Sequence, residues 1–144
     1  MKRILITLIA LMSVCFSANA QLNVVKTQKQ TEVVAKGTYG AILALDEKYG
    51  YVLGIASTNR YDRVGMIMLG TTKQEAITTL RDLYELCSSI GKEVVTIVPY
   101  EGETCTIQAG DIKNSLRLKF DDHAGYCILM NKDLQKLIDY FNGL

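Results

Sequence analysis

The sequence predicts an α+β fold in which antiparallel β-meanders are each followed by a helix, with the helices packed on one face of a shared sheet. Three observations support this fold class. Short apolar segments alternate with turn residues along most of the chain, and apolar residues recur at helical spacing in two places. Each helical stretch follows the same kind of strand, Gly65–Leu69 in the first half and Gly125–Leu129 in the second. The match raises the hypothesis of a ββββα repeat; the alternative is coincidence, because strand-then-helix is a common order.

Length and composition indicate one domain of ordinary size. The chain has 144 residues, of which 49% are apolar and 22% are charged, close to the average for a globular protein. The net charge of +1 excludes a strongly basic nucleic-acid binder, so no nucleic-acid partner is expected. We expect a single α+β domain over residues 31–144, preceded at residues 21–30 by a flexible arm or an edge strand.

The first twenty residues are typical of a secretory signal peptide. Lys2 and Arg3 open the chain, and an apolar run of 13 residues, Ile4–Phe16, precedes an Ala-Asn-Ala motif that ends at Ala20. A membrane-spanning helix needs about 20 residues, so the run is too short for an anchor, and no span is expected in the mature chain. We expect cleavage near Ala20 and export to the periplasm or the cell exterior. Loss of Lys2 and Arg3 leaves 14 basic residues against 15 acidic ones, a net charge of −1.

The first meander predicts four strands separated by polar turns. The residues from Asp46 to Gly50 suit a turn that ends in a positive-φ glycine. Residues 58–62 separate the third strand from the fourth. The expected strands are Glu32–Lys36, Tyr39–Leu45, Tyr51–Ser57 and Arg63–Leu69.

The first helix is the best-defined element of the mature chain. Thr72 followed by Glu75 forms a capping box, and Gly91 supplies a C-terminal stop. Steps of one and three residues keep the apolar side chains on one stripe of the helix. The stripe consists of Ala76, Ile77, Leu80, Leu83, Tyr84, Cys87 and Ile90.

A second meander and a second helix complete the chain. Polar turns at residues 99–102, 110–115 and 121–125 separate the segments. Asn131 is expected to cap the final helix, which also carries one apolar stripe. The expected strands are Glu93–Val98, Glu103–Ala109, Leu116–Phe120 and Tyr126–Met130, and the stripe contains Leu134, Leu137, Ile138, Phe141 and Leu144.

The strand that closes each meander is apolar at nearly every position, at residues 66–69 and 127–130. A strand with two apolar faces is usually central in its sheet and covered on both sides. A helix can cover one face, and the other needs the rest of the chain or a second copy. The sequence therefore also allows a homodimer.

His123 is the one histidine, and it follows Asp121 and Asp122. The sequence contains no spacing typical of metal ligands or of an activated nucleophile, so we expect no metal, no cofactor and no catalytic residue. Aspartate and glycine favour turns for backbone reasons, and residues 121–125 are interpreted as a solvated turn. The alternative is a small secreted hydrolase in which His123 acts with an aspartate or a cysteine.

Three cysteines remain after loss of the signal peptide, so at most one internal disulfide can form. Cys87 lies on the stripe of the first helix, whereas Cys105 and Cys127 lie on strands of the second meander. Cys105 and Cys127 are therefore the candidate disulfide pair, if their geometry permits it. Each cysteine also fits a buried structural role.

Four tyrosines fall in or beside loops and are candidates for a recognition surface. They are Tyr49, Tyr51, Tyr61 and Tyr100, and His123 is a fifth binding candidate. Tyrosine provides a large contact area at low entropic cost, although it is also a normal half-buried strand residue.

The function that these observations favour is an exported, non-enzymatic binding or interaction module for a protein or a small ligand. Two alternatives remain open. One is the hydrolase that uses His123, and the other is an inhibitor of a secreted enzyme that presents a rigid loop such as Pro99–Glu103.

Overall fold

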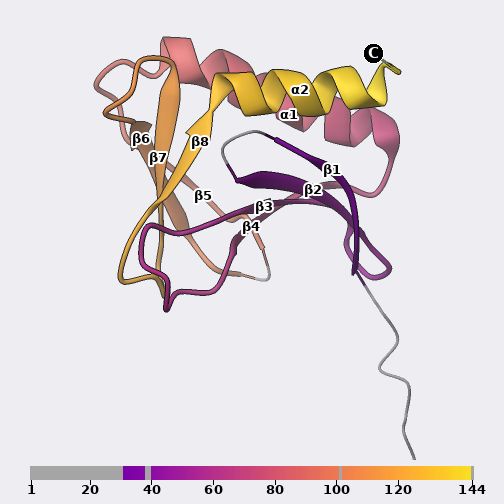
Figure 1. The fold of residues 1–144 in the computed structure, drawn as a ribbon. Helices are drawn as coiled ribbons and strands as arrows, with labels where there is room; N and C mark the ends of the chain where they lie inside the picture. Colours follow the sequence, from indigo (N-terminus) through magenta and orange to yellow (C-terminus); the bar gives the residue numbers. More distant parts are fainter. Residues whose placement is uncertain (1–30, 38–39, 101, 144) are drawn as a thin grey trace, which may run out of the picture. The chain divides into compact units, whose positions relative to one another are not determined.

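The computed structural model describes residues 31–37, 40–100 and 102–143. These residues form two four-stranded antiparallel sheets and two helices, an α+β fold (Figure 1). The expected signal peptide at residues 1–20, the arm at residues 21–30, and also Tyr39 and Leu144, lie outside the described residues.

Two separate sheets replace the single shared sheet that the sequence predicts. The strands of each sheet lie in sequence order, as expected for meanders, and the sheets meet at one isolated bridge between Ser57 and Cys127. The first sheet contains β1 (Thr31–Lys36), β2 (Ala41–Asp46), β3 (Gly50–Ile55) and β4 (Gly65–Gly70), and the second contains β5 (Val95–Ile97), β6 (Cys105–Ala109), β7 (Ser115–Phe120) and β8 (Cys127–Met130). All eight predicted strands are present, with bounds shifted by a few residues.

The turn between β2 and β3 forms as its composition predicts. The Asp46 carboxylate accepts hydrogen bonds from the backbone N–H groups of Lys48 and Tyr49, at 2.8 and 3.1 Å. Gly50 follows with φ +79°, a conformation that glycine adopts without strain.

Helix α1 (Lys73–Ser89) has the predicted cap at Thr72, whose hydroxyl oxygen accepts from the Glu75 backbone N–H at 3.1 Å. The Glu75 side chain accepts from the backbone N–H of Thr71 at 3.0 Å, one residue earlier than a standard capping box. Gly91 has φ +55° just beyond the helix, as a C-terminal stop requires.

The predicted cap of helix α2 (Asn131–Phe141) is wrong. Met130 occupies the N-cap position, and among the described residues no side chain forms a capping hydrogen bond at this helix end. The reason is that β8 runs directly into the helix. Asn131 is already helical, and its backbone N–H donates to the carbonyl oxygen of Asn114 at 3.1 Å.

One hydrophobic core unites both sheets and both helices. Helix α1 lies beside α2 and contacts β4 and β7, while α2 contacts β1 and β8. Alternate strand residues point into this core, such as Leu43, Leu53 and Ile67 in the first sheet and Ile107, Leu118 and Cys127 in the second.

The strands that close the meanders are edge strands, not central ones as expected from their apolar sequences. β4 ends the first sheet and β8 ends the second. The outer face of β4 is only partly covered, since Met68 is 39% exposed. The free edge of β4 forms a hydrogen bond with a residue outside the sheet, because the backbone N–H of Met68 donates to the carbonyl oxygen of Pro99 at 2.8 Å.

Candidate functional site

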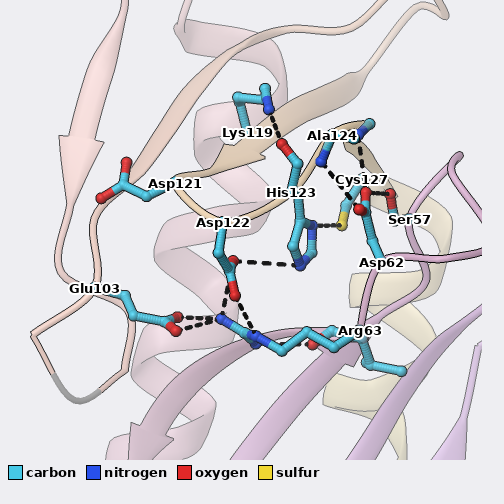
Figure 2. A network of polar contacts seen from close by, with 12 residues as sticks. Ser57, Asp62, Arg63, Glu103, Lys119, Asp121, Asp122, His123, Ala124 and Cys127 are labelled. Atoms are coloured by element: carbon cyan, nitrogen blue, oxygen red, sulfur yellow. Dashed lines mark hydrogen bonds and ion pairs between the residues drawn. The ribbon is translucent and has the colours of Figure 1, made fainter.

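The loop between β3 and β4 binds the turn between β7 and β8 through a set of polar contacts, here called the interloop network (Figure 2). The backbone N–H of Thr58 donates to the Tyr126 carbonyl oxygen at 2.8 Å, and the Tyr126 N–H donates to the Thr58 hydroxyl oxygen at 3.2 Å. Gly125 permits this close approach. A Cβ atom added at that residue would lie 2.7 Å from the Thr58 hydroxyl oxygen.

Asp62 is the centre of the interloop network. Its carboxylate accepts from the Ser57 hydroxyl at 2.7 Å and from the backbone N–H groups of Ala124 and Gly125 at 2.9 and 2.8 Å. Burial alone would raise the pKa of Asp62, but these hydrogen bonds outweigh that effect and lower the pKa from 3.8 to about 2.

Arg63 extends the network toward two further carboxylates. Its Nε donates to Asp122 at 2.8 Å, and its terminal nitrogen pairs with Glu103. The hydrogen bond from Arg63 holds the pKa of Asp122 below its usual range. These side chains are about a third to a half exposed, so solvent screens the ion pairs and their contribution to stability is small.

The His123 side chain is buried inside this network, which corrects the expectation of a solvated turn. His123 is 3% exposed, and its ring packs on Phe120 with centroids 4.9 Å apart. The backbone does form a turn, with the His123 N–H donating to the Phe120 carbonyl oxygen at 3.1 Å. Asp121 and Asp122 remain exposed on that turn, while the imidazole falls on the side that faces the core.

Cys127, His123 and Asp122 occupy the order of a nucleophile, a base and an orienting acid. His123 Nδ1 lies 3.8 Å from Cys127 Sγ and Nε2 lies 3.8 Å from the Asp122 carboxylate, so the three groups touch at the long end of hydrogen-bond and ion-pair distance. Among the described residues, Nε2 has no hydrogen-bond partner. Burial raises the pKa of the fully buried Cys127 thiol to about 11, so the thiol is protonated at neutral pH.

Acid should weaken the interloop network. The pKa of Asp62 is lower in the folded chain than its usual value, so its contribution to stability is complete above about pH 4 and is lost as the pH falls toward about 2. We expect the urea midpoint of the Asp62→Asn variant to vary less over this range than that of the unmodified chain. Equal pH dependence in both proteins would show that Asp62 does not stabilise the fold through its charge.

The three described cysteines, Cys87, Cys105 and Cys127, are free and buried. The candidate disulfide between Cys105 and Cys127 is therefore not formed. The reason lies in the sheet order, because β7 separates β6 from β8. Two interstrand steps alone span about 10 Å, and the register adds an offset because Cys127 lies opposite Leu118 and Ile107, two residues from Cys105. The Cα atoms are therefore farther apart than the roughly 7 Å that a disulfide can bridge.

The five predicted binding residues do not converge on one site. Tyr49 and Tyr100 pack against each other with ring centroids 4.9 Å apart, whereas Tyr51 packs edge-on against Phe141 at 5.2 Å. Tyr61 is 81% exposed in the β3–β4 loop, where its hydroxyl accepts from Arg60. The fifth candidate, His123, is enclosed in the core.

A cavity of about 360 Å³ lies on the outer face of the second sheet, and we call it the outer-face pocket. Strand register places its residues together, because Thr106 pairs with Lys119 and Gln108 pairs with Arg117. Neighbours along each strand point into the core, so these side chains share the opposite face. The pocket is lined by Thr106, Gln108, Arg117, Lys119 and Tyr126.

Two cations and one aromatic ring dominate the outer-face pocket. The Arg117 guanidinium lies over the Tyr126 ring, 4.5 Å from its centroid, and one terminal nitrogen pairs with Asp111. The Arg117 Nε is buried and has no hydrogen-bond partner within the described ranges. Lys119 donates to the His123 carbonyl oxygen, which links the pocket to the interloop network.

None of these five pocket residues is among the binding residues that the sequence predicts. One signal was available, because polar Thr106 and Gln108 alternate with apolar Cys105 and Ile107 in β6. Such alternation identifies a solvent-facing side of a strand but not its neighbours in the sheet. Only the register places Arg117 beside Gln108.

Comparisons with protein-family models, with curated proteins and with solved structures found no match. Within the part of the chain that the structure describes, no group of three or more His, Cys, Asp or Glu side chains is placed to hold a metal ion. None of the described helices is long and apolar enough to cross a membrane.

Proposed function

We propose that this protein is an exported, non-enzymatic binding module, and that its ligand occupies the outer-face pocket. The observation that carries the proposal is the convergence of Arg117, Lys119 and Tyr126 in one cavity. Ligand sites commonly combine a concave surface with a few polar groups that set orientation. The pocket has both features, and its residues come from β6, β7 and the turn just before β8, in a sheet that the core holds in place.

The hydrolase alternative receives less support from the geometry. A general base must reach its substrate, and the His123 side chain is enclosed on all sides. The one thiol near it is protonated at neutral pH and donates to the Ile55 carbonyl oxygen at 3.5 Å. We interpret His123 and Cys127 as core residues that pack beneath the interloop network.

The inhibitor alternative requires a projecting rigid loop. Pro99 is instead buried, and its carbonyl oxygen is bound to the edge of β4. Tyr100 packs on Tyr49. An inhibitor would present the Pro99 carbonyl group and the Tyr100 ring to its enzyme. In this structure both groups contact the protein's own chain instead.

Three further proposals concern the whole protein. Export with cleavage near Ala20 is proposed from the N-terminal sequence. Protein recovered from the cell envelope whose intact mass still includes residues 1–20 would contradict it. Internal duplication is supported by the repeated element order of four strands and one helix. A homodimer would use the outer face of the first sheet, where the exposed Val33 and Met68 stand at the two ends of an apolar row whose middle residues, Ala44 and Val52, are already buried. A monomer mass by light scattering at high concentration would exclude it.

The binding proposal is tested by a fragment screen on ¹⁵N-labelled protein, expressed with its own N-terminal segment. We expect the amide shifts caused by binding fragments to concentrate at Thr106, Gln108, Arg117 and Tyr126. A second cavity, lined in part by Tyr51 and Phe141, serves as the internal control. Shifts that concentrate at the second cavity, or no binding fragment at all, would overturn the proposal.

A further inference from the structure

We propose that the outer-face pocket recognises a small molecule in which a carboxylate is attached to a flat ring. This inference rests on the proposed function, because it names the ligand class for the same pocket. Its basis is the juxtaposition of an unpaired arginine donor, a second cation and an aromatic ring in one small cavity.

The charge of the pocket selects an anion. Arg117 and Lys119 both line the cavity, and the carboxylate bound to Arg117 comes from Asp111, a residue outside the lining. The Asp111 side chain is 78% exposed, so water screens that ion pair and competes for it. A ligand carboxylate in the cavity can therefore replace Asp111.

The orientation of Arg117 selects a carboxylate. The Nε atom is buried without a partner among the described residues, and a buried donor without a partner is unfavourable. Once Asp111 is displaced, the terminal N–H groups of the guanidinium form a planar fork that matches the two oxygens of a carboxylate. Stacking on Tyr126 holds the guanidinium in place before the ligand arrives, so less conformational entropy is lost on binding.

The size and walls of the pocket select a ring. A volume of about 360 Å³ is at the small end of the roughly 300–1,000 Å³ typical of ligand sites, which favours a small molecule. Tyr126 and the methyl group of Thr106 provide apolar surface, and Gln108 provides an amide that can bond to a ring substituent.

The experiment is an NMR titration of the protein with benzoate. Benzamide, which has nearly the same shape but no charge, is the control ligand. We expect benzoate to give saturable shifts at Thr106, Gln108, Arg117 and Tyr126, with benzamide at least about tenfold weaker. Phenyl phosphate separates a carboxylate site from a general anion site, and tighter binding of phenyl phosphate than of benzoate would overturn the carboxylate assignment.

Three variants complete the test. Arg117→Gln should weaken benzoate binding by about tenfold or more, and Asp111→Asn should tighten it by about two- to threefold because the competing carboxylate is removed. Arg60→Gln is the matched control, since Arg60 also stacks on a tyrosine, with its guanidinium 4.8 Å from the Tyr61 ring, but does not line the pocket. Spectra that overlay outside the pocket establish that each variant is folded.

The outcomes separate this inference from the function on which it rests. Equal binding of benzoate and benzamide, or unchanged affinity in Arg117→Gln, would refute carboxylate recognition while the pocket remains a binding site. If fragments of other chemistry bind in the pocket and benzoate does not, the inference fails and the proposed function stands. If nothing binds there, both fail.

Discussion

Replacement of Phe120 by alanine is expected to lower the free energy of unfolding by about 3–5 kcal/mol. Phe120 is fully buried at the end of β7, where it pairs with Cys105 and supports the His123 ring. Removal of its ring loses buried apolar surface and leaves a cavity beneath the interloop network. Because domains of this size are stable by only about 5–15 kcal/mol, the loss is a large share of the total.

Urea unfolding followed by far-ultraviolet circular dichroism measures this effect. Tyr61→Ala is the control, since Tyr61 is 81% exposed and its removal should change stability by less than about 0.5 kcal/mol. A loss below about 1.5 kcal/mol for Phe120→Ala would show that the site collapses around the vacancy and that the ring does not support the two loops.

The second large effect is expected for Gly65→Val, at about 2–3 kcal/mol. β4 begins at Gly65, where the first sheet packs against the Phe120 ring of the second. A Cβ atom added there would lie 2.4 Å from Phe120 Cε2 and 3.0 Å from Cys127 Sγ. Neither neighbour has space to move, because both side chains are fully buried.

A double variant tests whether the collision is the cause. Gly65→Val combined with Phe120→Ala should lose less stability than the sum of the two single losses, by at least about 1 kcal/mol, because the valine enters the vacated space. Met66→Val is the control for strand propensity, as Met66 is the next residue of β4 and lies on its other face. Strict additivity of Gly65→Val and Phe120→Ala would mean that Gly65 is required for another reason.

These two residues support our proposal that the constellation of Cys127, His123 and Asp122 has a structural role. Gly65 and Phe120 bring the two sheets together around His123, and the interloop network closes over it. The same packing that places a thiol and an imidazole near each other also buries both side chains. The contact between Cys127 and His123 therefore belongs to the core, whereas the outer-face pocket lies on the opposite face of the second sheet.

The sequence determined the elements, and the tertiary structure decided what they do together. Thr72 with Glu75, and Asp46 with Gly50, act within a few residues, so helix α1 and the β2–β3 turn could be predicted from local patterns. Asp62 binds Ala124 across 62 residues of chain, and no local pattern specifies such a partner. The division into two sheets, the burial of His123 and the assembly of the outer-face pocket all depend on contacts of this kind, because strand register and core packing are set by the whole chain at once.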